Sequence, residues 1–122
     1  MDQKIFSDRM LDETFAYGRL ALSNAVLLNG AAATAVAAFL ANHTGAIKVG
    51  MHNAILRFAV GAGLGGIASI FAYFGQRMDW EVSIGRSHLR PLANTLIWTA
   101  LGLAITAYGL FFWGCVGASA GF

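Results

Sequence analysis

The stretch LALSNAVLLNGAAATAVAAFLA, residues 20–41, contains no charged side chain. A helix of about twenty apolar residues is long enough to cross the roughly 30 Å of hydrocarbon in a bilayer. Two more apolar stretches follow at residues 54–74 and 92–116, and the only charge in either is Arg57, near the start of the first. The sequence therefore predicts three membrane-spanning segments.

The composition of the chain supports a lipid environment. Hydrophobic residues make up 57% of the 122 residues and charged residues 11%, whereas about a quarter of a typical soluble domain is charged. Backbone polar groups in lipid must be hydrogen-bonded within the protein, which helices achieve and a few open strands do not. We therefore expect an all-α membrane protein, a single membrane domain over residues 1–122 with three transmembrane helices.

The N-terminal segment, residues 1–19, is predicted to be an amphipathic helix that precedes the first span. Apolar side chains recur there at roughly helical spacing, with Asp8, Arg9, Asp12 and Glu13 between them. Such a helix either lies on the membrane surface or runs straight into the first span. A cleavable signal peptide begins with basic residues, whereas this segment is rich in acidic ones, so we expect no signal peptide.

The basic residues predict an orientation. With three spans, the N-terminal segment and the polar loop 75–91 lie on one side of the membrane, and Pro91 suits the first turn of the third helix. Six of the eight basic residues fall on that side: Lys4, Arg9, Arg19, Arg77, Arg86 and Arg90. The other side has only Lys48 and Arg57. Because cytoplasmic loops are enriched in Lys and Arg, we expect a cytoplasmic N-terminus in a bacterial inner membrane.

Two other topologies are compatible with the sequence. The third span, with Gly102, Gly109 and Gly114, could consist of two half-helices, and the first could be a re-entrant hairpin around Asn29 and Gly30. Three full spans are favoured because glycine is tolerated in membrane helices and neither apolar stretch is long enough to cross twice.

The sequence contains no convincing catalytic, cofactor-binding or metal-binding set. No acid lies in a predicted span, as proton-coupled transport would require. His43, His52 and His88 fall outside the spans, and the glycine-rich stretch 61–66 lacks the preceding strand of a nucleotide-binding loop. No basic run suggests nucleic-acid binding. We expect a protein that is not an enzyme, with no cofactor and the lipid bilayer as its surroundings.

Small residues at helical spacing predict where helices approach one another closely. Gly61, Gly65 and Ser69 share one face of the second span. The first span offers Gly30, Thr34 and Ala38, and the third offers Gly102 and Thr106. These faces are expected to contact another helix, within the chain or between chains.

Asn24 and Asn29 are the most informative polar residues, because an amide at membrane depth needs hydrogen-bond partners. They are about 140° apart around a helix and need not share a face. The favoured interpretation is that these amides form hydrogen bonds between helices. The alternative is a polar ring that lines a pore in an oligomer. Arg57 is one turn inside the second span, where a lipid phosphate or an asparagine is a plausible partner.

The residues Leu27, Leu28, Asn29 and Gly30, followed by the small-residue run Ala31 to Ala38, resemble a first-span pattern of short bacterial multi-pass inner-membrane proteins of unassigned function. The resemblance implies a small inner-membrane protein and carries over no catalytic residue. Respiratory dehydrogenase anchors have the same size and number of spans, but their intramembrane Arg and haem-ligand His find no match here.

Three classes of function remain. The first is a non-enzymatic oligomer, a homo-oligomer that assembles through small-residue helix faces, with a pore-forming or membrane-perturbing oligomer as one form of it. The second is an accessory or anchor subunit that docks to a partner membrane subunit through the N-terminal helix and the loop 75–91. The third is a quinone- or haem-binding respiratory anchor, which the positions of the histidines disfavour.

The orientation can be tested with reporter fusions. A reporter that is active only in the periplasm should be active when fused to Phe122 and inactive when fused after Arg77, because most of the basic residues are expected in the cytoplasm. The reverse pattern of activity would contradict the orientation.

Overall fold

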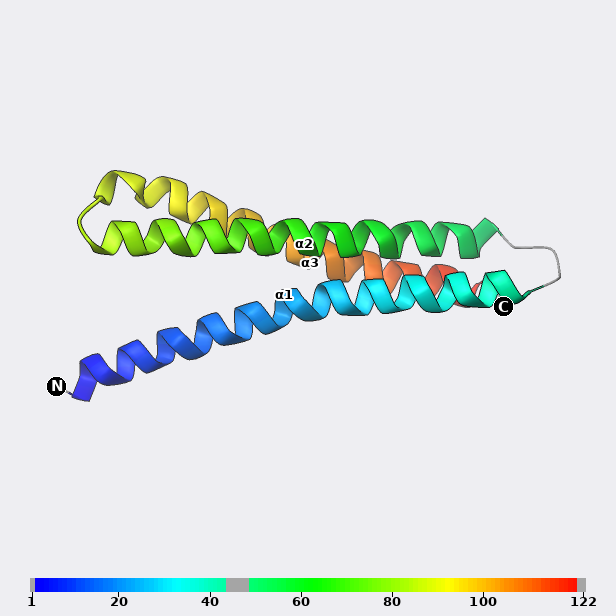
Figure 1. Ribbon diagram of the computed structural model, residues 1–122, viewed down its shortest axis with the longest axis horizontal. Coiled ribbons are helices and arrows are strands. Elements are labelled where there is room, and N and C mark those ends of the chain that lie inside the picture. Colours follow the sequence, from blue (N-terminus) through cyan, green and yellow to red (C-terminus); the bar gives the residue numbers. More distant parts are fainter. Residues whose placement is uncertain (1, 44–48, 121–122) are drawn as a thin grey trace.

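The computed structural model describes residues 2–43 and 49–120. Three long helices run side by side with alternating direction: α1 (Asp2–Asn42), α2 (Val49–Ser83) and α3 (Arg90–Ser119), with a 3-10 turn η1 (Ser87–Leu89) before α3. The N-terminal end of α1 and the α2–α3 connection lie at one end of the molecule, which we call the charged end (Figure 1). The C-terminal end of α3 lies at the other end, which we call the uncharged end because α3 has no charged side chain after Arg90.

Each long helix contains a segment long and apolar enough to cross a membrane, and the described residues contain no strand. The prediction of an all-α chain with three candidate spans is confirmed at this level. Lys48 lies outside the described residues.

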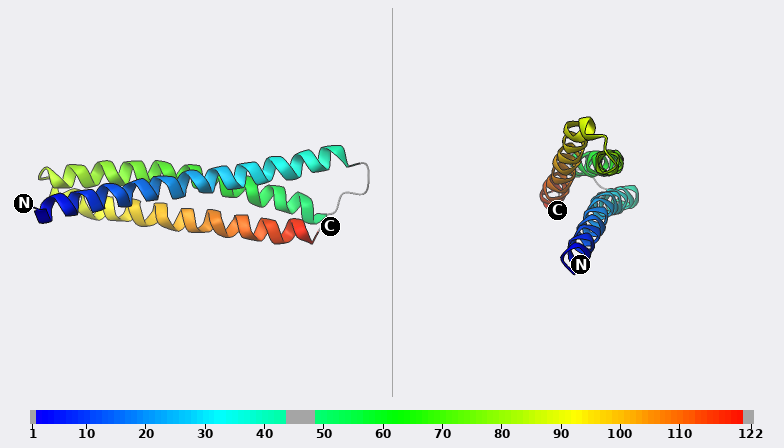
Figure 2. Two further views of the ribbon diagram at one scale, coloured as in Figure 1. Left: turned by 90° about the horizontal axis from the view of Figure 1, so that it is seen from below. Right: turned by 90° about the vertical axis from the view of Figure 1, so that its left-hand side faces the viewer.

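The N-terminal segment and the first span form one helix. Of the two arrangements that the sequence left open for residues 1–19, α1 has the one that continues into the first span without a break. The end of this segment diverges from α2 and α3 (Figures 1 and 2). Its large apolar side chains, including Phe6, Met10 and Tyr17, are exposed.

Helix α2 continues to Ser83, well beyond the apolar segment that ends at residue 74, so much of the expected loop 75–91 is helical. Hydropathy indicates only which part of a helix lipid can contact. A helix can continue past that part, because its backbone hydrogen bonds do not depend on apolar side chains. The helix ends where Gly85 takes a φ of +109°. There the Gly85 N–H donates to Val82 O at 3.2 Å and the Arg86 N–H to Glu81 O at 3.1 Å. This paired bonding is a Schellman motif, which favours glycine at that position.

Helix α3 starts at Arg90 with Pro91 in its first turn. Backbone N–H groups there have no partner within the helix, so the N–H that proline lacks is not missed. Both α1 and α3 are unbroken along their apolar segments. The described chain thus contains neither a re-entrant hairpin at Asn29 and Gly30 nor two half-helices in the third span.

The core of the bundle is made of small side chains. Most of its buried residues are Ala and Gly, and the largest fully buried side chains are Phe58 and Asn29. Apolar burial drives helices together only weakly in lipid, so close van der Waals contact between small residues takes over that role. Helices α2 and α3 form the most extensive contact of the bundle, with Phe58 of α2 packed against Gly114 of α3.

The Phe58–Gly114 contact can be tested with matched substitutions in α3. A Cβ atom added at Gly114 would lie 2.8 Å from Phe58 Cζ, whereas one at Gly109 would meet nothing within 4 Å. Gly114→Leu should therefore destabilise the protein by about 1–3 kcal/mol through overpacking. Gly109→Leu should leave its thermal stability in detergent unchanged, and equal melting temperatures for the two variants would contradict this packing.

Candidate functional site

The side chain of Asn29 lies at the point where all three helices meet and is fully buried. Its amide nitrogen donates to Ala25 O on its own helix at 2.8 Å and to Ala107 O on α3 at 3.2 Å. Both partners are carbonyl oxygens that only accept, so the NH₂ group must face them. Both N–H donors of the amide are therefore used, one of them across a helix boundary.

The carbonyl oxygen of Asn29 faces Gly61 of α2. It has no donor partner in the described chain, yet it is completely buried. A Cβ atom added at Gly61 would clash with it and would lie 2.7 Å from Asn29 Cγ. The glycine Cα hydrogen in that direction therefore points at the oxygen, as in the weak C–H···O contacts found at helix interfaces. Asn29 thus contacts α2 through its oxygen and α3 through its nitrogen.

Two further contacts hold α1 to the bundle. Gly65 lies one turn from Gly61, and a Cβ atom added there would be 3.3 Å from the Val26 backbone nitrogen of α1. Tyr108 of α3 donates its hydroxyl to Ala21 O of α1 at 2.7 Å. Ser69, the third residue of the predicted face, is partly buried and donates back to Gly65 O at 3.0 Å. Gly61 and Gly65 thus lie against α1.

The other small residues singled out in the sequence lie elsewhere. A Cβ atom added at Gly30 or Gly102 would meet nothing within 4 Å. The Thr34 and Thr106 hydroxyls, both exposed, donate back to Gly30 O and Gly102 O at 2.9 Å. Ala38 is also exposed. These residues do not pack between the three helices of one chain. Of the two contacts that the sequence predicted for them, within the chain or between chains, the one between chains stays a prediction.

Asn24 has the opposite placement to Asn29. It lies near the charged end of the first apolar segment, about 6 Å along the helix from Leu20, and its side chain is exposed. No hydrogen bond joins its amide to another residue of the described chain. Even a bond back to its own helix would satisfy only one of its two N–H donors and leave the carbonyl oxygen without a donor.

Asn24 belongs to a continuous exposed face of α1. The residues of this face follow one another at alternating spacings of four and three, the repeat of a helix-packing seam. We call this face the outer seam: Leu20, Asn24, Leu27, Ala31, Thr34, Ala38 and Ala41, all exposed. It points away from the side that carries Asn29. The four-and-three spacing could have been read from the sequence, but only the burial of Asn29 indicates which side of α1 faces outward.

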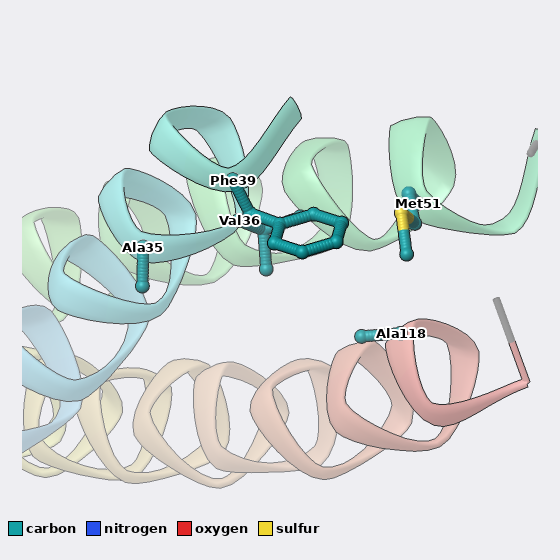
Figure 3. A pocket seen from close by; sticks show the side chains of 5 residues that line it. All are labelled: Ala35, Val36, Phe39, Met51 and Ala118. Carbon is teal, nitrogen blue, oxygen red and sulfur yellow. The ribbon is translucent and has the colours of Figure 1, made fainter. Parts of the chain in front are cut away.

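The uncharged end of the bundle contains a small apolar hollow of about 200 Å³. It lies between all three helices and is lined by Ala35, Val36, Phe39, Met51 and Ala118 (Figure 3). These side chains offer no group for acid–base or ligand chemistry. The hollow is suited to apolar atoms, such as a hydrocarbon chain.

The histidines do not converge. His43 stacks on Phe39 at a ring-centroid distance of 5.3 Å near the uncharged end, and His88 lies in η1 at the charged end. Within residues 2–43 and 49–120, no three His, Cys, Asp or Glu side chains are grouped so that they could hold a metal ion. Cys115, the only cysteine of the sequence, is exposed.

Comparison of the chain with protein-family models, with curated proteins and with solved structures finds no match.

A double-mutant cycle tests the contact between Asn29 and Gly61. Gly61→Ala alone should destabilise the protein by about 1–3 kcal/mol, because its methyl group has no room beside the amide. In an Asn29→Ala background the space is free, and the same change should cost less than about 0.5 kcal/mol. Gly63→Ala, at an exposed position with open space, is the control. Additive effects of the two substitutions on the unfolding free energy would contradict the contact.

Proposed function

We propose that this protein is a non-enzymatic membrane protein that self-assembles through the outer seam of α1. The single observation that carries the proposal is the exposed amide of Asn24 within the first apolar segment, which has no hydrogen bond to any other described residue. Lipid tails satisfy none of its donors or its acceptor, so in a membrane this amide needs a partner from another molecule.

A second copy of the chain is the simplest partner for this amide. Copies inserted with one orientation meet with α1 helices parallel, related by a two-fold axis along the membrane normal. In a parallel seam each residue faces its own equivalent at the same depth. An amide carries both donor and acceptor groups, so Asn24 is complementary to Asn24 of a second copy.

The remaining residues of the outer seam suit close approach. Towards the uncharged end the seam contains Ala31, Thr34, Ala38 and Ala41, all of them small and exposed. Small residues at this spacing let two helix backbones come together in lipid. The Thr34 hydroxyl is already bonded to Gly30 O, so it places no unpaired donor in the seam.

The outer seam also determines which asparagine could line a pore in an oligomer. Asn29 is fully buried inside one chain, so it cannot line a channel between chains in this arrangement. Of the two asparagines in the first span, Asn24 is the one that faces outward. A water-filled channel would have to be lined by Asn24, whereas a dry interface would pair its amides directly. The dry interface is favoured because the small residues further along the same seam, Ala31, Thr34 and Ala38, permit close contact between the helices.

The accessory or anchor subunit is the second candidate. It is favoured by the part of α1 that extends past the first apolar segment at the charged end, where Ile5, Phe6, Met10 and Leu11 are all exposed. An apolar surface on a helix that diverges from its own bundle suits a partner or the membrane surface. A respiratory anchor receives no such support, since the histidines lie outside the apolar segments.

Self-assembly can be measured as energy transfer between copies labelled at Cys115, the single, exposed cysteine. Asn24→Leu removes the paired amides, worth about 0.6–2 kcal/mol, and should raise the dissociation constant in detergent or vesicles by about 3- to 30-fold. Ala38→Leu should weaken assembly too, because it adds bulk to the seam. Ala37→Leu adds the same bulk at an exposed position off the seam and should behave as wild type.

A monomeric wild type, or equal assembly of the Ala37→Leu and Ala38→Leu variants, would refute the seam as an interface. Leakage of a dye from vesicles that contain the wild type, abolished by Asn24→Leu, would identify the oligomer as a channel instead of a dry assembly.

A further inference from the structure

Arg57 of α2 extends its guanidinium group towards the uncharged end of the bundle. Its Nη1 atom donates to Trp113 O of α3 at 3.2 Å and lies 2.6 Å from where a Cβ atom of Gly117 would stand. Gly117 itself lies beside Gly50, seven residues and roughly 10 Å before Arg57 along α2. The side chain therefore reaches along α2 from the apolar segment towards its boundary, as snorkelling arginines do.

Arg57 has no acidic side chain on its own end of the molecule to balance its charge. The sequence has no Asp or Glu between residues 14 and 78 or after residue 81. The one ion pair of the described chain, Arg86 with Glu81 at 2.6 Å, lies at the charged end. A half-buried guanidinium in or near hydrocarbon is costly without an anion.

The surroundings of Arg57 are suited to a phosphate group. One of its five N–H donors is used in the bond to Trp113 O, so others remain for a ligand. Its guanidinium carbon lies 4.2 Å from the centroid of the Trp113 ring, a cation–π contact that holds the charge beside the ring. Asn53, one turn nearer the boundary on the same face of α2, is exposed and has no hydrogen bond to the described chain.

From this geometry we infer that Arg57, Asn53 and Trp113 form a binding site for the phosphate of an anionic lipid headgroup at the uncharged end of the bundle. Guanidinium groups bind phosphate through several donors in one plane. A tryptophan at this depth is typical of the boundary between lipid tails and headgroups. The inference requires the three helices to span the membrane and does not depend on self-assembly.

Trp113 provides a local measurement of lipid binding. Trp80 and Trp98 are both exposed, so Trp80→Phe and Trp98→Phe together leave Trp113 as the only tryptophan without disturbing the core. Quenching of its fluorescence by bromine-labelled phosphatidylglycerol is compared with quenching by bromine-labelled phosphatidylcholine. The anionic lipid should be preferred by about fivefold at Trp113, and the preference should disappear in Arg57→Gln.

Further variants and one soluble anion separate the alternatives. Arg77→Gln removes an exposed charge at the other end and should keep the preference. Arg57→Lys retains the charge without the planar donors and should keep only part of it. Inorganic phosphate should not displace the lipid. Equal quenching by both lipids in the protein that keeps Arg57 and has Trp113 as its only tryptophan would overturn the inference even if Arg57→Gln failed to fold. An undiminished preference in Arg57→Gln, or full displacement by inorganic phosphate, would overturn it too.

Discussion

The arrangement of the three helices depends on one buried amide. Asn29 donates to Ala25 O on its own helix and to Ala107 O on α3, and its oxygen lies against Gly61 of α2. In hydrocarbon an unsatisfied amide costs several kcal/mol, so rotations of α1 that expose it are disfavoured. Because apolar side chains are as well solvated by lipid as by protein, this polar contact and the small residues around it fix the rotation of α1.

The two asparagines of the first span illustrate how one residue type serves two purposes. Asn29 has both N–H donors bonded inside the chain, whereas Asn24, five residues earlier, has no hydrogen bond to another described residue. Once the burial of Asn29 fixes which side of α1 faces the bundle, the side that carries Asn24, Ala31 and Ala38 must face outward. Folding of one chain and the proposed association of two chains are therefore linked through the rotation of a single helix.

The ends of the molecule differ in the way their charges are balanced. All six acidic residues of the sequence and six of the eight basic residues fall at the charged end, where Glu81 pairs with Arg86 beside the Gly85 turn. At the other end Arg57 has a ring and a backbone carbonyl as neighbours and no carboxylate side chain. The acidic and basic side chains of the charged end can thus pair within the chain, whereas Arg57 has no acidic side chain at its own end with which to pair.

The sequence by itself determined the number of candidate spans and their helical class, because uncharged stretches of this length, such as residues 20–41, can satisfy their backbone in lipid only as helices. It also marked Gly61, Gly65 and the two asparagines as residues of interest. It could not decide that α2 continues to Ser83, since hydropathy does not register where a helix ends in water. Nor could it decide which of Asn24 and Asn29 is buried. It also could not decide that Gly114 packs against Phe58 of another helix, whereas a Cβ atom added at Gly102 would meet nothing within 4 Å. Those outcomes depend on the rotation of each helix about its axis, and only the contacts between helices set that rotation.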